Sequence, residues 1–158
     1  VDGDAVLLGE AHDGSATSSS VPSVTLAASG AVMPEVLDAA AELAEEGVRA
    51  HVVDVTSLDR LYVAWQRTLR QGVRTATTPS VPGALRAAFP SGVPVVTVHD
   101  AASHAMAWIG SALGVPAVPL GVDAFGQSGS VPELYELHDL TTGSIVNAAL
   151  AALELGAR

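Results

Sequence analysis

The sequence feature that most constrains the fold is an alternation between short apolar runs and longer helical patterns. The apolar runs occupy residues 24–28, 51–55, 93–98 and 117–120, and each ends at a polar residue or a glycine. The segments between them are long enough to carry helices. Strands that are almost continuously apolar are typical of a parallel sheet covered on both faces. The pattern therefore predicts a three-layer α/β domain with a mostly parallel sheet.

The helical segments have recognisable apolar faces and ends. In the segment that begins near Pro34, apolar side chains recur at three- and four-residue spacing, and Gly47 follows as a left-handed cap. Ser130 and Glu133 have the spacing of a capping box and predict the start of another helix. The same reasoning predicts further helices over residues 56–72, 83–89, 104–113 and 142–155.

The first 20 residues differ from the rest. Residues 5–8 form a short apolar run that is a candidate for one antiparallel edge strand, and residues 13–20 are small and polar, as in a flexible linker. We expect residues 1–20 to connect the chain to a preceding domain and residues 21–158 to form one folded unit. The chain begins without methionine, which suggests a piece of a longer polypeptide.

The charge of the chain excludes several classes of partner. Seven basic residues face 17 acidic ones, which gives a formal net charge of −10. Phosphate backbones and anionic lipids repel such a chain, so we expect neither a nucleic-acid nor a membrane partner. The absence of cysteine excludes disulfides and thiolate chemistry, and no apolar run is long enough to span a bilayer. We therefore expect a cytoplasmic protein.

The glycine-rich segment at residues 121–129 has only part of a phosphate-binding loop. Gly121 and Gly126 have the spacing of a Walker A motif, and Ser128 takes the place of its hydroxyl residue. Gln127, however, occupies the lysine position, and the chain contains no lysine. The backbone amides alone could still hold an anion. The favoured interpretation is a tight turn beneath Phe125, which acts as an apolar plug.

Three side chains that could serve a site follow the third apolar run. His99 and Asp100 come at its carboxyl end, and His104 opens the next helix. The two histidines are five residues apart, whereas a helical zinc pair requires a spacing of four. Ser103 lacks the strand-to-helix elbow of a hydrolase. The favoured interpretation is that Asp100 or Ser103 caps the helix and that the histidines form local hydrogen bonds.

Arginines are concentrated in one helical segment. Arg60, Arg67, Arg70 and Arg74 are four of the seven arginines and lie mainly on one side of the helix predicted over residues 56–72. Guanidinium groups in such a cluster could dock an acidic neighbour or bind an anion. The simpler interpretation is a solvated face, where exposed ion pairs contribute little.

Residues 121–129, read as GVDAFGQSG, are followed by Leu134-Tyr135 and by a helix that carries Ile145-Val146. This series resembles the end of the transketolase C-terminal domain, which is the third domain of thiamine diphosphate enzymes. Residues 29–62 and 94–114 are most similar to the homodimeric type of pyruvate dehydrogenase first component. The resemblance extends over residues 21–155.

The resemblance implies a structural domain. The parent enzyme would decarboxylate a 2-oxo acid on thiamine diphosphate and pass the acyl group to a lipoyl carrier. Thiamine diphosphate and magnesium would be held by the preceding domains, so this domain would contain no catalytic, cofactor or metal residue and would be inactive alone. Its implied partners are the preceding domains, a homodimer partner and a lipoyl acyltransferase. The alternatives are the same domain of a transketolase or related ketol-transferring synthase, and a stand-alone module that binds small anions.

Candidate contact residues follow from both lines of reasoning. The resemblance implies that Asp100 and His104 face a neighbouring domain or subunit. The arginine-rich helix and the glycine-rich segment supply the remaining candidates for an interface or an anion contact. The complete set is Arg60, Asp100, His104, Asp123, Phe125, Gly126 and Ser128.

Overall fold

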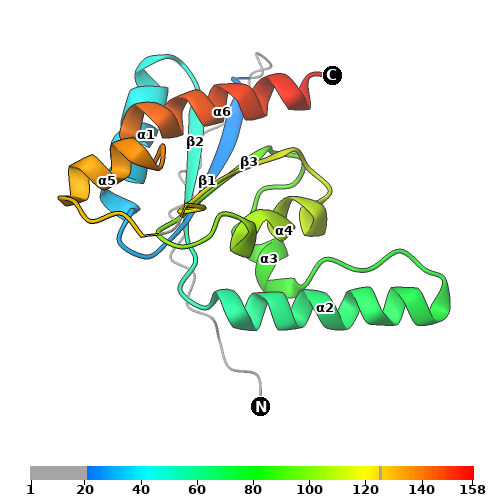
Figure 1. Cartoon of the computed structure of the whole chain (residues 1–158). Helices are drawn as coiled ribbons and strands as arrows, with labels where there is room; N and C mark the ends of the chain where they lie inside the picture. The colour runs from blue at the N-terminus through cyan, green and yellow to red at the C-terminus, as the bar shows by residue number, and fades with distance from the viewer. Residues whose placement is uncertain (1–20, 125) are drawn as a thin grey trace.

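A computed structural model describes residues 21–124 and 126–158 and contains the predicted three-layer α/β fold (Figure 1). The four-stranded sheet has the order β2-β1-β3-β4, and every pair of neighbouring strands is parallel. The strands are β1 (Ser23–Ser29), β2 (Arg49–Asp54), β3 (Val95–His99) and β4 (Ala117–Leu120). All four predicted strands are confirmed. The edge strand predicted at residues 5–8 lies outside the described residues.

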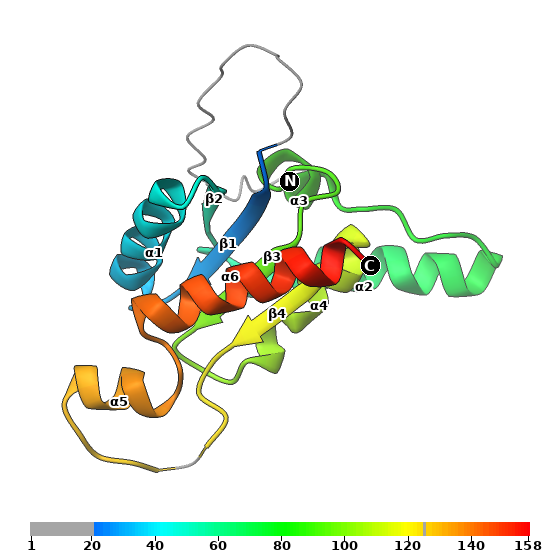
Figure 2. The same ribbon diagram turned by 90° about the horizontal axis from the view of Figure 1, so that it is seen from above.

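Helices cover both faces of the sheet, as Figure 2 shows from above. On one face lie α1 (Met33–Glu45) and α6 (Thr142–Gly156), and on the other lie α2 (Leu58–Thr75), α3 (Gly83–Ala88) and α4 (His104–Leu113). A short helix, α5 (Val131–Leu137), stands beside the carboxyl ends of the strands. The predicted bounds of the helices agree with these to within three residues.

The sheet separates two apolar cores. Leu26 of β1 packs into the core beneath α1 and α6, whereas the next residue, Ala27, packs into the core beneath α2, α3 and α4. This opposite placement follows from the two-residue period of side chains along a strand. Both residues are completely buried. The central strand therefore needs apolar residues on both faces, which explains the continuous apolar run in the sequence.

Gly47 ends α1 as predicted, whereas Gly72 lies within α2 and does not end it. Gly47 follows α1 with a φ of 77°, in the left-handed region that favours glycine. The end predicted for α2 at Gly72 is wrong, because the helix continues to Thr75 and ends at Ala76 with a φ of 51°. Gly72 is buried where the chain folds back, and a Cβ there would lie 2.6 Å from the Thr77 carbonyl oxygen. It is thus needed for close packing and not for a turn.

None of the helices in residues 21–124 and 126–158 combines the length and the apolar character that crossing a membrane requires.

Candidate functional site

The candidate site lies at the carboxyl edge of the sheet, between β1 and β3. The chain leaves β1 toward β2 on one side and leaves β3 toward β4 on the other, so the strand order reverses between these two neighbours. Ser29 and His99, the last residues of the two strands, are paired in the register. Ligand sites of open α/β sheets are found at such a switch point. The topology therefore directs attention to the loops that follow Ser29 and His99.

Asp100 connects these two loops. Its Oδ2 accepts a hydrogen bond from the backbone amide of Ala31 at 2.9 Å, and its Oδ1 accepts one from Nδ1 of His99 at 3.2 Å. Gly30 has a φ of 94°, and a Cβ at this position would overlap the Asp100 carboxylate. Asp100 therefore joins the start of α1 to the end of β3. The predicted local hydrogen bond of a histidine is confirmed for His99.

The helix cap predicted from Asp100 or Ser103 is wrong. Ser103 is the N-cap residue of α4, but neither its side chain nor that of Asp100 caps the helix. Asp123, from the loop after β4, accepts a hydrogen bond from the Ser103 amide at 2.9 Å and another from the Ser103 hydroxyl at 2.6 Å. These two bonds lower the pKa of the Asp123 carboxyl, and the neighbouring His104 and His138 lower it further to a smaller extent.

Backbone contacts hold the same loop in place. Val122 donates a hydrogen bond to the Ala101 carbonyl at 2.9 Å. Gly121 packs so closely on the backbone of Ala101 and Ser103 that its position has no room for a Cβ. Residues 121–123 are therefore fixed against the N-terminus of α4.

Asp123→Asn is expected to loosen this loop, because the neutral amide has a single acceptor oxygen for the two Ser103 donors and removes the charge that strengthens both bonds. The Ser103 amide should exchange with deuterium several-fold faster. In the unaltered chain its protection should persist above the unfolded carboxyl pKa and be lost as the pH falls through the lowered folded pKa. Hydrogen exchange read by NMR checks both. Glu136→Gln, on the exposed side of α5, is the control, and equal effects of the two changes would contradict the role given to Asp123.

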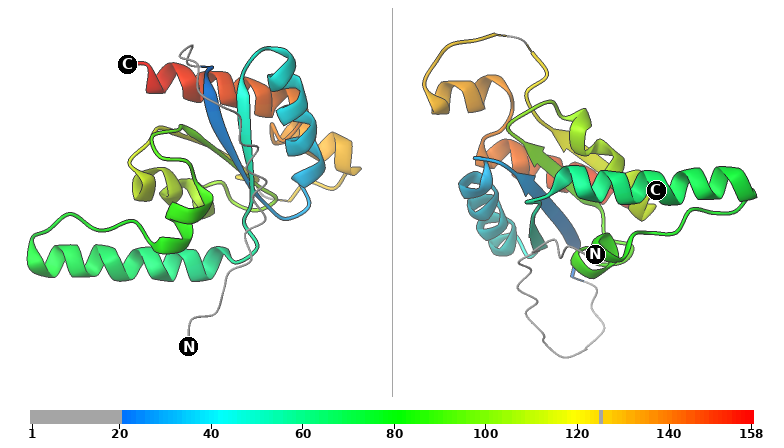
Figure 3. Two further views of the ribbon diagram at one scale, coloured as in Figure 1. Left: turned by 180° about the vertical axis from the view of Figure 1, so that it is seen from behind. Right: turned by 90° about the horizontal axis from the view of Figure 1, so that it is seen from below.

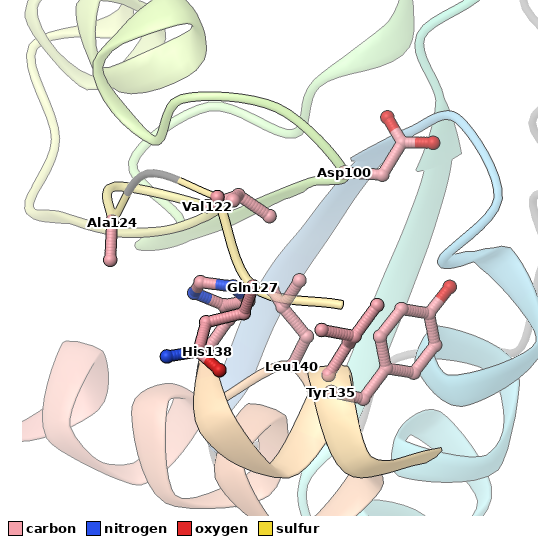
Figure 4. Close-up of a pocket in the computed structure, with 9 residues that line it drawn as sticks. Asp100, Val122, Ala124, Gln127, Tyr135, His138 and Leu140 are labelled. Atoms are coloured by element: carbon pink, nitrogen blue, oxygen red, sulfur yellow. The ribbon is translucent and has the colours of Figure 1, made fainter. Parts of the chain in front are cut away.

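A small pocket of about 220 Å³ opens between this loop and α5 (Figure 4). Helix α5, which forms one side of the pocket, begins with the predicted capping box of Ser130 and Glu133. Glu133 Oε2 accepts hydrogen bonds from the Ser130 amide and hydroxyl, each 2.8 Å long. These bonds lower the pKa of Glu133. The pocket is lined by Asp100, Val122, Ala124, Gly126, Gln127, Leu134, Tyr135, His138 and Leu140.

The electrostatics of the pocket disfavour anions. Burial raises the pKa of Tyr135, and the carboxylates of Glu35 and Asp100 raise it further. Figure 4 places the Tyr135 hydroxyl and Asp100 on the same side of the pocket. Neither lysine nor arginine lines it. A phosphate would therefore meet negative charge here, and the geometry does not support the anion-binding interpretation of the glycine-rich segment.

The described residues do not fit thiamine diphosphate with magnesium. Magnesium is bound by carboxylate and other oxygen ligands, and its diphosphate partner needs positive charge or a row of free amides. Within residues 21–124 and 126–158, no three acidic or histidine side chains are gathered as a metal-binding group.

The structure brings together some of the predicted contact residues and separates others. Asp100 and Gly126 line the pocket, and Asp123 lies close to the exposed His104. Ser128 is exposed in the adjoining loop, and Arg60 is exposed on α2, away from the pocket. Phe125 lies outside the described residues.

Sequence reasoning missed Tyr135 and His138 as pocket residues. They are three residues apart at the end of α5, so they lie on one side of this helix. Their three-residue spacing could have indicated that they share one side of α5, although nothing in the sequence indicates that this side faces Asp100.

Most of the chain matches the model of one known protein family. The model of the transketolase-like TK C-terminal domain matches residues 14–141. The chromosomal and plasmid transketolases of Cupriavidus necator are each 29% identical to the chain, over 136 and 133 residues respectively. These matches include 84% of this chain and 17% of each relative. The chain therefore spans about a sixth of the length of these curated relatives.

Solved structures agree with the fold. A split-gene transketolase described as an inactive beta4 tetramer has a TM-score of 0.59 and 26% identity, over 86% of this chain and 41% of that one. The transketolase from Leishmania mexicana has a TM-score of 0.57 and 25% identity, over 83% of this chain and 16% of that one. The predicted fold class is confirmed by these neighbours.

Proposed function

The chain belongs to the transketolase-like TK C-terminal domain family, and from this premise we propose that it is the non-catalytic C-terminal domain of a thiamine diphosphate-dependent, ketol-transferring enzyme. The observation that carries the proposal is the family match over residues 14–141. The two curated relatives are both transketolases, which supports this alternative over the pyruvate dehydrogenase interpretation.

In this proposal the domain supports assembly and leaves the chemistry to other domains. Thiamine diphosphate and magnesium would be held there, because the described residues here supply no metal-binding group and the chain has no lysine. The domain would contact the preceding domains and a second subunit. The description of the split-gene relative as an inactive tetramer is in keeping with an assembling unit that lacks activity alone. The boundary at residue 21 remains a prediction.

Isothermal calorimetry of the isolated chain tests this proposal. Titration with thiamine diphosphate and Mg²⁺, and separately with inorganic phosphate, is expected to give no binding heat, because no described group is arranged for either ligand. Tight binding of the cofactor would contradict a domain without a cofactor site. Tight binding of phosphate would instead favour the stand-alone module. The reading frame upstream of Val1 adds a second test, since it should encode the glycine-aspartate metal motif expected of thiamine enzymes.

A pyruvate dehydrogenase first component is the second candidate. It rests on the resemblance noted for residues 29–62 and 94–114, whereas the relatives found are transketolases. Only this candidate calls for a lipoyl acyltransferase as partner. Full-length protein assayed with phosphorylated ketose and aldose substrates, and in parallel with pyruvate and a lipoyl acceptor, separates the two. If the protein turned over pyruvate and not the phosphorylated ketose and aldose substrates, the transketolase assignment would be rejected.

A further inference from the structure

Helix α2 presents a basic face that forms no salt bridge with the other described residues, although Arg70 donates a hydrogen bond to Gln66 at 3.5 Å. Opposite its buried side, five exposed residues recur at spacings of three or four along its whole length. We call this set the basic ridge, and it consists of Arg60, Val63, Arg67, Arg70 and Arg74. Nowhere in residues 21–124 and 126–158 does an arginine form a salt bridge, although the chain has a large excess of carboxylates. The positive charge of the basic ridge is therefore available to another molecule.

The position of α2 also leaves apolar surface uncovered. Leu61 and Trp65 anchor its first half in the core, whereas its second half extends past the sheet, as both views in Figure 3 show. Val73 in this second half is 82% exposed, and Tyr62 and Val63 are also exposed. Such apolar groups beside unpaired charges are typical of an interface.

Helix α1 carries the complementary charge at the same spacing. Three exposed acidic residues recur at intervals of four and three residues, and we call this set the acidic ridge: Asp38, Glu42 and Glu45. Leu37, which precedes the first of them, is 54% exposed. In both ridges the pattern repeats every seven residues, which is about 10.5 Å along a helix. Charges on the two ridges can therefore be paired at more than one point.

The two ridges cannot meet within one molecule, because α1 and α2 lie on opposite faces of the sheet (Figure 1). We propose that the basic ridge on α2 of one copy docks on the acidic ridge on α1 of a second copy. Like charges exclude a contact between two α2 helices or two α1 helices. The inference goes beyond the proposed function, because this contact is a property of the chain and needs no other domain.

The arrangement determines the kind of assembly. A copy that uses its α2 still offers its α1 on the other side, so the contact is head-to-tail. Association then continues beyond two copies unless a ring closes. Each exposed ion pair contributes little and is screened by salt, so the assembly should be weak and sensitive to ionic strength.

Analytical ultracentrifugation of the whole chain tests the contact. In about 0.05 M salt the weight-average mass should rise with concentration above the monomer mass of 15.9 kDa, and in about 1 M salt it should return to that value. Arg67→Glu with Arg70→Glu should keep the chain monomeric, and so should Asp38→Arg with Glu42→Arg. The matched controls are Arg86→Glu with Arg158→Glu and Glu136→Arg with Glu154→Arg, which alter as many charges away from both ridges and should still associate.

Mixing the two ridge variants gives the sharpest result. Each variant alone places like charges on its two ridges, whereas an equimolar mixture again pairs opposite charges, so association should return. Circular dichroism confirms that each variant is folded. Unaltered chain that stays monomeric in low salt at every concentration would overturn the proposal and leave both ridges to a different partner. Association that persists in both ridge variants, or that is lost equally in the controls, would also overturn it.

Discussion

Gly121→Ala is expected to lower the free energy of unfolding by about 3 kcal/mol, which is at the upper end of the usual cost of overpacking. A Cβ at this position would lie 2.5 Å from both the carbonyl oxygen of Ala101 and the amide nitrogen of Ser103. These are backbone atoms, so no change of rotamer can relieve the overlap. The loop after β4 would have to move away from α4, and the two bonds between Asp123 and Ser103 would be weakened. Urea unfolding followed by circular dichroism measures the loss.

The control for this change is Gly143→Ala. Gly143 lies in the first turn of α6, and a Cβ there would have no neighbour within 4 Å. Alanine should be neutral or slightly stabilising at this position, since it favours helix more than glycine does. If Gly121→Ala proved as mild as Gly143→Ala, the loop would not be held against α4 in the way described.

Gly30→Ala is expected to cost about 2–3 kcal/mol, from two separate causes. Alanine at a positive φ, here 94°, costs about 1–2 kcal/mol. In addition, the new methyl group would displace the Asp100 carboxylate and break its bond with the Ala31 amide, which contributes about 1 kcal/mol. The loss is measured by urea unfolding, as for Gly121→Ala.

Gly47→Ala isolates the first cause, the positive φ. Gly47 also has a positive φ, of 77°, but a Cβ there would be in open space. Its substitution should therefore cost only the backbone part. In a chain that also carries Asp100→Ala, the cost of Gly30→Ala should fall toward that of Gly47→Ala. If Gly30→Ala still lowered the free energy of unfolding by more than Gly47→Ala in the Asp100→Ala chain, contact with Asp100 would not be the reason for the additional cost at Gly30.

The main elements of the fold could be predicted from the sequence because each depends on a local pattern. Residues 24–28 and 117–120 are strands because apolar runs of this length end at turn residues, and α4 begins and ends at the predicted residues. The end of α2 was missed because Gly72 is required by the distant Thr77 carbonyl and not by its own φ.

The contacts within the site could not be predicted, because they join residues that are far apart in the chain. Asp100 meets Ala31 across 69 positions and Asp123 meets Ser103 across 20, so only the strand order brings the partners together. A local interpretation of Asp100 as a helix cap was reasonable from the sequence and wrong in the structure. The same holds for Tyr135, whose environment depends on Glu35 in a helix 100 residues earlier.

The exposed loop over residues 126–129 is anchored on one side by Asp123 and on the other by the capping box of α5. Because the chain has no cysteine, Ser128→Cys would create a unique attachment point for a fluorescent dye on the exposed residue next to Gln127, which lines the pocket. A dye at that point would change its emission when a neighbouring domain or a small molecule arrived, while the sheet behind it stayed intact. Residue 128 is therefore a suitable labelling position for detecting molecules that bind at the carboxyl edge of the sheet.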